Sequence, residues 1–114
     1  MVSTSKEEFN TALTMRLGPD YCLVHSVSLQ ATHLAVLCHK KLASHISNIS
    51  SKHTKLGAGG DLANKGGIRI SFKLAQSHIC FLGAHLTSDF ENQERRNADL
   101  KMMLDNLAFV LPLE

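Results

Sequence analysis

A glycine-rich segment at residues 56–67 carries side chains that are well suited to contact an anion. It runs Leu-Gly-Ala-Gly-Gly-Asp-Leu-Ala-Asn-Lys-Gly-Gly and holds five of the seven glycines. Glycines permit unusual torsions and leave backbone N–H groups accessible, and Asn64 and Lys65 add an amide donor and a cation. The pattern is therefore typical of two structures, a phosphate-contacting loop and a plain hairpin connector, and it does not choose between them.

Two nucleotide-binding motifs do not fit this segment. In a P-loop, a glycine precedes the lysine and a serine or threonine follows it, whereas Asn64 and Gly66 flank Lys65. A dinucleotide fingerprint leads into a helix. The glycines here lead into the alternating run Ile68–Leu74, which predicts a strand.

His85 is a further residue that could take part in chemistry. It lies near the end of the apolar run Ile79–Leu86. A core histidine bound to a backbone carbonyl is one interpretation, and a titratable group at a strand tip, where α/β proteins often place their sites, is the other. The other six histidines have no metal-ligand spacing, so we predict no metal site from the residues of this chain.

A third cluster opens the last predicted helix and contains Arg95, Arg96, Asn97 and Asp99. Two arginines near a helix N-terminus oppose the helix dipole, which favours acidic side chains there. Such a local conflict often marks contact with an anion or an ion pair across the fold. An ordinary solvated first turn is the alternative.

The elements that must position these residues form a mixed α/β pattern. Ser5 and Glu8 match a capping box, and Gly18-Pro19 ends the helix that follows. The first strands are expected at 20–29 and 32–39, around a turn at Gln30-Ala31, with a weaker strand at 44–52. The cysteines Cys22, Cys38 and Cys80 are far apart in sequence and odd in number, so we expect buried free thiols in a reducing compartment.

The second half is predicted to hold two strands and a helix. Residues 68–74 alternate, which predicts one buried and one wetter face, whereas 79–86 is apolar on both faces and is expected to be a central strand. A helix is expected from about Asn92 to Leu111. Its apolar stripe comprises Leu100, Met103, Leu104, Leu107 and Leu111.

Charge and composition disfavour nucleic acid as a partner. The net charge is only +2, and the basic excess is confined to residues 1–57, which carry six Lys and Arg against three Asp and Glu. A duplex-binding domain usually carries a denser basic stripe. The N-terminus has no apolar signal core and no run approaches membrane-spanning length, so we expect a cytoplasmic chain.

Taken together, several short blocks resemble the middle of the inositol polyphosphate 5-phosphatase catalytic domain, and the type IV phosphoinositide 5-phosphatases most of all. The family's blocks are Asn-Lys-Gly-Gly-Val, Phe-Cys-Phe, Ser-His-Leu and Arg-Arg-Asn-x-Asp-Tyr. The matching blocks occur in order within roughly residues 17–112: Asn64-Lys65-Gly66-Gly67-Ile68, Ile79-Cys80-Phe81, Ala84-His85-Leu86 and Arg95-Arg96-Asn97-Ala98-Asp99.

The resemblance implies a fragment of a DNase I-like α/β fold, a four-layer α/β/β/α sandwich of the endonuclease/exonuclease/phosphatase superfamily. It implies Mg²⁺-dependent removal of the 5-phosphate from a phosphoinositide or a soluble inositol polyphosphate, with peripheral membrane contact. By the same resemblance, His85 is catalytic beside the scissile phosphate and Asn64 and Lys65 bind substrate. Arg95, Asn97 and Asp99 support the site.

The sequence departs from the family pattern in ways that limit this prediction. Ala63 and Ala84 replace the usual Gly and Ser, Leu100 replaces the Tyr, and the acidic Asp61 weakens the case for docking on an anionic membrane. The family's magnesium-binding Glu has no match before Met15. Its Gly-Asp-x-Asn and Ser-Asp-His segments would follow Glu114.

We therefore expect residues 1–114 to be the central portion of a catalytic domain, without its N- and C-terminal catalytic segments and inactive by itself. Two alternatives remain open. One is a non-catalytic remnant or interaction module of the same fold. The other is a DNase I-like nuclease, which the weak basicity and the Asn-Lys-Gly-Gly block disfavour.

Overall fold

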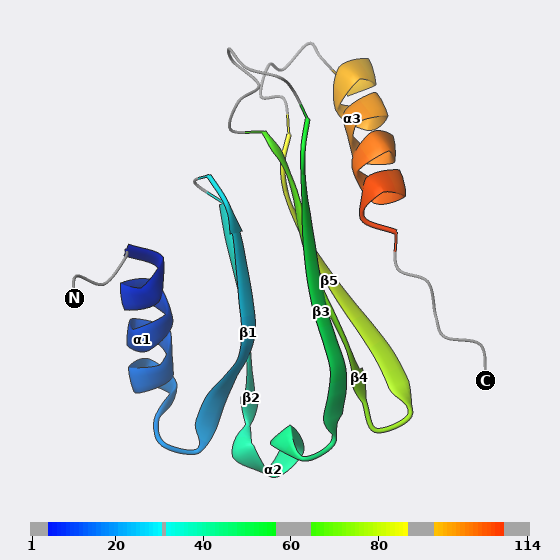
Figure 1. Ribbon diagram of the computed structural model, residues 1–114. Coiled ribbons are helices and arrows are strands. Elements are labelled where there is room, and N and C mark those ends of the chain that lie inside the picture. The colour runs from blue at the N-terminus through cyan, green and yellow to red at the C-terminus, as the bar shows by residue number, and fades with distance from the viewer. Residues whose placement is uncertain (1–4, 31, 57–64, 87–92, 109–114) are drawn as a thin grey trace.

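The computed structural model describes residues 5–30, 32–56, 65–86 and 93–108, which form two antiparallel sheets and three helices (Figure 1). The first sheet has the order β1-β2 and the second the order β3-β4-β5. In chain order the elements are α1 (Ser5–Leu17), β1 (Tyr21–Leu29), β2 (Thr32–His39), α2 (Lys40–Ala43), β3 (Ile46–Lys55), β4 (Gly66–Leu74), β5 (Ser77–His85) and α3 (Gln93–Asn106).

The elements stack in four layers, in the order α1, β1-β2 hairpin, three-stranded sheet and α3 (Figure 1). Asn10 of α1 donates to Ser26 Oγ of the hairpin at 3.1 Å. On the far side, Met103 of α3 lies directly over Gly67 of β4. The expected α/β/β/α sandwich is therefore confirmed, and the two sheets face each other between the helices.

The predicted boundaries of α1 and of the hairpin are confirmed. Gly18 has a φ of 97°, and its N–H donates to Thr14 O at 3.0 Å, which closes the last turn of α1. Gln30 also has a positive φ, of 52°, at the tip of the hairpin. The left-handed torsion at Gly18 lies where the chain leaves α1 for β1, and that at Gln30 lies where β1 turns back into β2.

The short helix α2 was not predicted. It begins after His39, whose Nδ1 accepts a hydrogen bond from the Lys41 N–H at 3.1 Å. Histidine is not among the side chains that usually cap helices. The sequence therefore gives no cap signal for a helix of one turn. None of the described helices is long and apolar enough to cross a membrane.

The prediction for the two later strands is wrong in its central feature. Within the described sheet β4 is central and buried along most of its length, whereas β5 forms an edge. Phe81 and Leu82 of β5 are 45% and 46% exposed. Arg69 of β4 is also buried, and its Nη1 donates at 2.9 Å to the carbonyls of Leu107 and Ala108 at the end of α3, which offsets the cost of burying its charge. Alternation reports which side chains are apolar, but not which faces other elements cover.

The predicted glycine loop and the last helix also need correction. Gly66 and Gly67 belong to β4, so the last two residues of the loop predicted at 56–67 are part of a strand. Of the predicted stripe on α3, Met103 and Leu107 are 1% and 2% exposed, but Leu100 and Leu104 are 37% and 43% exposed. Of these side chains, Met103 and Leu107 pack against β4, over the space that the missing side chain of Gly67 leaves. Leu111 lies outside the described residues.

The three cysteines differ from the expectation of separate buried thiols. Cys38 is buried, Cys22 is half-buried and Cys80 is exposed. Cys22 lies directly across the hairpin from Cys38, with the two Sγ atoms 3.8 Å apart. The pair arises because the hairpin register brings two positions together that are 16 residues apart in sequence.

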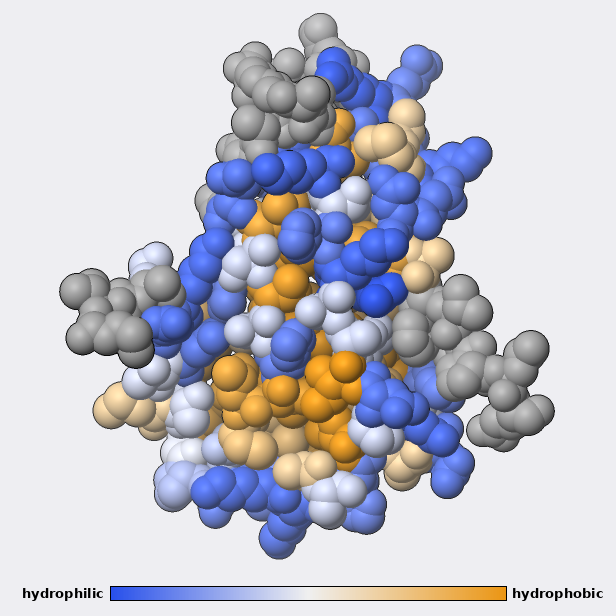
Figure 2. Space-filling model, in the orientation of Figure 1, coloured by the Kyte–Doolittle hydropathy of each residue, from blue (hydrophilic) through white to orange (hydrophobic). Residues whose placement is uncertain are grey.

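Apolar side chains gather between the two sheets toward the lower half of the face in Figure 2, near the end that carries α2. They line a cavity of about 380 Å³ with side chains from both sheets, among them Leu37, Phe72 and Phe81. The apolar core between the sheets is therefore open at this end of the molecule.

Candidate functional site

Lys65 and His85 meet at one end of the three-stranded sheet. Lys65 directly precedes β4 and His85 ends β5, and the antiparallel register places His85 opposite Gly66. The Lys65 Nζ lies 2.9 Å from the His85 Nε2, and both residues are half-buried. The structure thus brings together the cation and the imidazole that the sequence analysis singled out separately.

The Lys65–His85 hydrogen bond has a defined direction. A lysine ammonium has only donors, so His85 Nε2 accepts and carries no proton. The imidazole is then neutral, with its proton on Nδ1. In this state the Lys65 cation is held by a ring nitrogen rather than by a carboxylate, and it keeps further N–H donors for an anionic ligand.

Gly66 fixes the backbone that carries Lys65, and the sequence analysis did not single it out by itself. A Cβ at this position would overlap the Thr54 carbonyl oxygen of β3 and lie 2.5 Å from Leu29 Cδ2 of the hairpin. The Lys65 carbonyl accepts a hydrogen bond from the Leu56 N–H at 3.1 Å. Close packing at Gly66 and a hydrogen bond at Lys65 therefore hold this backbone where the Lys65 side chain reaches His85.

The residues predicted to support the site lie on the first turns of α3. Arg95 and Asn97 are exposed and Asp99 is half-buried. Helix α3 begins at the same end of the sheet at which β5 ends (Figure 1). Their predicted role as braces stays a prediction. Asn64 lies outside the described residues.

The described residues do not form a site for Mg²⁺. This cation takes oxygen ligands, mainly carboxylates and water. Among residues 5–30, 32–56, 65–86 and 93–108, no three His, Cys, Asp or Glu side chains converge. The positive charge of Lys65 beside His85 favours an anion and repels a metal cation.

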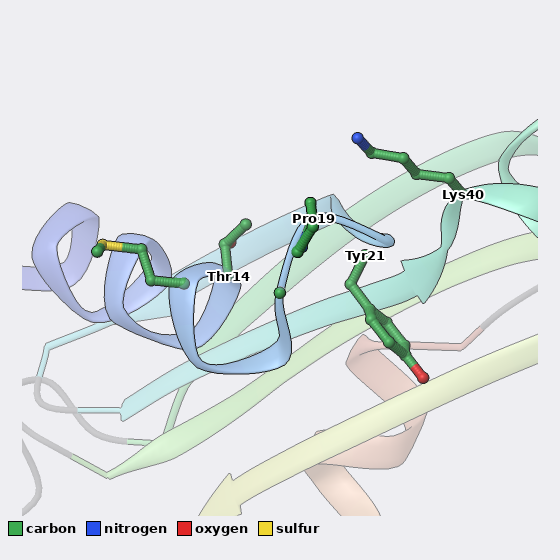
Figure 3. A pocket seen from close by; sticks show the side chains of 6 residues that line it. Thr14, Pro19, Tyr21 and Lys40 are labelled. Carbon is green, nitrogen blue, oxygen red and sulfur yellow. The ribbon is translucent and has the colours of Figure 1, made fainter.

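A separate pocket of about 400 Å³ lies at the end of α1, at the opposite end of the sheets from Lys65 and His85 (Figures 1 and 3). Figure 3 shows Thr14 and Pro19 beside Tyr21 and Lys40, which begin β1 and follow β2. Lys40 is the one charged residue among the described residues that line it. No acid–base pair is found there, so Lys65 and His85 remain the better candidates for chemistry.

The fold has two antiparallel sheets between helices and a polar pair at one end of a sheet, and these features agree with the family that the sequence matches. The family model for Endonuclease/Exonuclease/phosphatase family 2 matches residues 2–112. Since this match spans nearly the whole chain, the chain belongs to that family. The predicted superfamily is confirmed.

Within this family, the chain is similar to several inositol polyphosphate 5-phosphatases. The chain is 32% identical over 106 residues to the type II inositol 1,4,5-trisphosphate 5-phosphatase of Mus musculus, covering 91% of this chain and 11% of that protein. It is 35% identical over 91 residues to the type IV inositol polyphosphate 5-phosphatase 7 of Arabidopsis thaliana, covering 78% and 15%. These identities are too similar to assign a type.

A solved structure supports the same conclusion. The inositol polyphosphate 5-phosphatase domain of SPsynaptojanin, in complex with inositol (1,4)-bisphosphate and calcium ion, matches with a TM-score of 0.75 and 25% identity. The match covers 90% of this chain and 30% of that one. The fold is therefore that of a 5-phosphatase domain, of which this chain spans about a third.

Proposed function

We propose that the chain is the central part of an inositol polyphosphate 5-phosphatase catalytic domain. Its substrate class is a phosphoinositide headgroup or a soluble inositol polyphosphate, and the reaction is hydrolysis of the 5-phosphate monoester. Water attacks phosphorus, the P–O bond to the ring breaks, and an inositol hydroxyl and inorganic phosphate are released. The observation that carries this proposal is the 2.9 Å contact between Lys65 Nζ and His85 Nε2.

The pair suits phosphate binding because both side chains can donate to phosphoryl oxygens. When a phosphate arrives, Lys65 turns its ammonium from the imidazole to the anion. The released His85 Nε2 then takes a proton and donates to the phosphate as well. Donors held at this position stabilise negative charge on the phosphoryl group during transfer. Asn64 is proposed as a further substrate-binding donor.

The proposed intact enzyme uses Mg²⁺, with ligands supplied from outside the described residues. Relatives named as acting on inositol phosphates, and a neighbour solved with inositol bisphosphate and calcium ion, support a metal-dependent reaction on this substrate class. We further propose cytoplasmic activity with peripheral contact at membranes when the substrate is a lipid. The 114-residue chain by itself is expected to show no hydrolysis with Mg²⁺.

A binding experiment on the chain itself tests the site. Titration with a soluble inositol polyphosphate, followed by calorimetry, should show that Lys65→Ala weakens binding about 10- to 100-fold. A hydrogen bond to a charged group contributes about 1.5–3 kcal/mol, and about 1.4 kcal/mol is tenfold in Kd. Lys40→Ala is the matched control, because it removes the same charge at the opposite end of the sheets.

Two outcomes would contradict the proposal. Equal affinities for Lys65→Ala and Lys40→Ala would mean that binding follows overall charge rather than this site. Tighter binding of duplex DNA than of inositol polyphosphate would favour a nuclease. Phosphate release by the chain alone, above that of a His85→Ala variant, would refute the expectation that it is inactive.

A further inference from the structure

The β1-β2 hairpin holds two thiols in a position that the proposed phosphatase reaction does not use. Cys22 and Cys38 are direct partners across the antiparallel ladder, and their Sγ atoms are 3.8 Å apart. Directly opposed residues in such a ladder have Cα atoms about 4.5–5.5 Å apart. Disulfides join Cα atoms about 4.4–6.8 Å apart, so the hairpin backbone already has the spacing that a disulfide needs.

This pairing depends on a bulge. At the turn, Leu29 pairs with Thr32, and a regular ladder from there would place Cys22 opposite His39. The register shifts by one residue between Leu23 and His25, which brings Cys22 opposite Cys38 instead. Bulges re-aim side chains in this way and are specific features of a strand.

The two thiols differ in their surroundings. Cys38 is 9% exposed, and burial raises the pKa of its thiol, with the hydrogen bond to Cys22 as a second cause. Cys22 is half-buried. Both line a small cavity of about 170 Å³, together with Ile46 and Ile49 of β3, and this space admits a small oxidant. Cys22 is therefore the more accessible of the two thiols.

We propose that Cys22 and Cys38 are an oxidisable pair, which a peroxide converts into a cross-strand disulfide. The Cys22 thiolate attacks one peroxide oxygen and breaks the O–O bond, which gives a sulfenic acid and one water after protonation. The Cys38 sulfur then attacks the Cys22 sulfur, forms the S–S bond and releases the sulfenic oxygen as a second water. Two thiols lose two electrons and two protons, and one peroxide is reduced to two waters.

Mild hydrogen peroxide followed by alkylation and non-reducing peptide mapping tests this pair. The expected product is a 22–38 linkage with a mass decrease of about 2 Da, because each thiol loses one hydrogen. Cys22→Ser and Cys38→Ser should each abolish it. Cys80→Ser is the matched control and should leave it intact, because Cys80 is exposed on β5 in the other sheet.

A rate comparison keeps the test valid if a serine variant fails to fold. The linkage should form at least about 10-fold faster in the folded chain than in urea, because the fold holds the two sulfurs together. Equal rates in the two states would refute the proposal. So would a folded chain in which the oxidised products are Cys80-linked dimers or over-oxidised Cys22 without the 22–38 bond.

Discussion

The contact between Gly67 and Met103 determines how closely α3 packs on the sheet. A Cβ added at Gly67 would overlap Met103 Sδ and Cγ and lie 3.1 Å from Leu107 Cδ1. Met103 is 1% exposed, so its side chain is buried and cannot give way without disturbing its neighbours. Overpacking of this kind costs about 1–3 kcal/mol, and we expect Gly67→Ala to destabilise the chain by that amount.

The same methyl group should be harmless once Met103 is truncated. Met103→Ala by itself is expected to cost about 2–5 kcal/mol, because it empties a buried site. In that background the clashing atoms are gone, and the new methyl fills part of the cavity. Alanine also suits a strand interior better than glycine, by about 0.5–1 kcal/mol. The double variant should therefore be more stable than the sum of the single changes by about 1–3 kcal/mol.

Urea unfolding of the four proteins in this cycle measures the coupling. Gly66→Ala combined with Leu29→Ala is the matched control, because the added Cβ would still overlap the Thr54 carbonyl oxygen after Leu29 is truncated. That pair should show no rescue. If the Gly67 and Met103 effects add to within about 0.5 kcal/mol, the close packing of α3 on β4 described here is wrong.

Three further predictions concern charge and protonation. Arg69→Met should lower the free energy of unfolding by about 1–3 kcal/mol, measured in urea, because the carbonyls at the end of α3 lose charged donors, and Arg69→Lys should recover part of the loss. Burial, and secondarily the charge of Lys6, lower the pKa of His33 below its ordinary 6.5. The unfolded chain therefore binds the proton more readily, so stability should fall as pH drops below about 6.5 and His33→Gln should flatten that dependence in thermal unfolding. Raising salt should weaken inositol polyphosphate binding, and by less in Lys65→Ala than in the unaltered chain, measured by calorimetry.

The sequence predicts those elements that depend on a few neighbouring residues. The helix over 5–17 and the hairpin that follows it depend on a glycine C-cap and a short turn, both visible in the sequence. The burial of β4 and the exposure of β5 depend on what packs against them, and alternation cannot report that. Arg69 illustrates the difference, since it is charged and is nevertheless buried under the end of α3.

The candidate site was also predictable only in part. Lys65 and His85 were found from residue type and block spacing, and antiparallel pairing then brought them within hydrogen-bonding distance. Gly66 and Gly67 were noticed as members of a glycine-rich run and of the Asn-Lys-Gly-Gly block, without separate structural roles. Successive residues of a strand face opposite sides, so Gly66 faces the hairpin and Gly67 faces α3. A run of glycines does not show which of them faces which side. The Cys22–Cys38 pair depends on the position of a bulge, which no pattern in the residues indicates.

That irregularity in β1 has a wider effect, because it reverses which alternate residues point inward. Beyond it, Ser26 and Ser28 point to the α1 side, where they bond Asn10 and His33, while Leu29 reaches the β4 backbone. Before it, even-numbered Cys22 lies on the inner side. A one-residue deletion there would leave the composition almost unchanged. It would nevertheless exchange the inward-facing and outward-facing side chains over half of the strand. Insertions and deletions near Val24 should thus be tolerated far less well than substitutions.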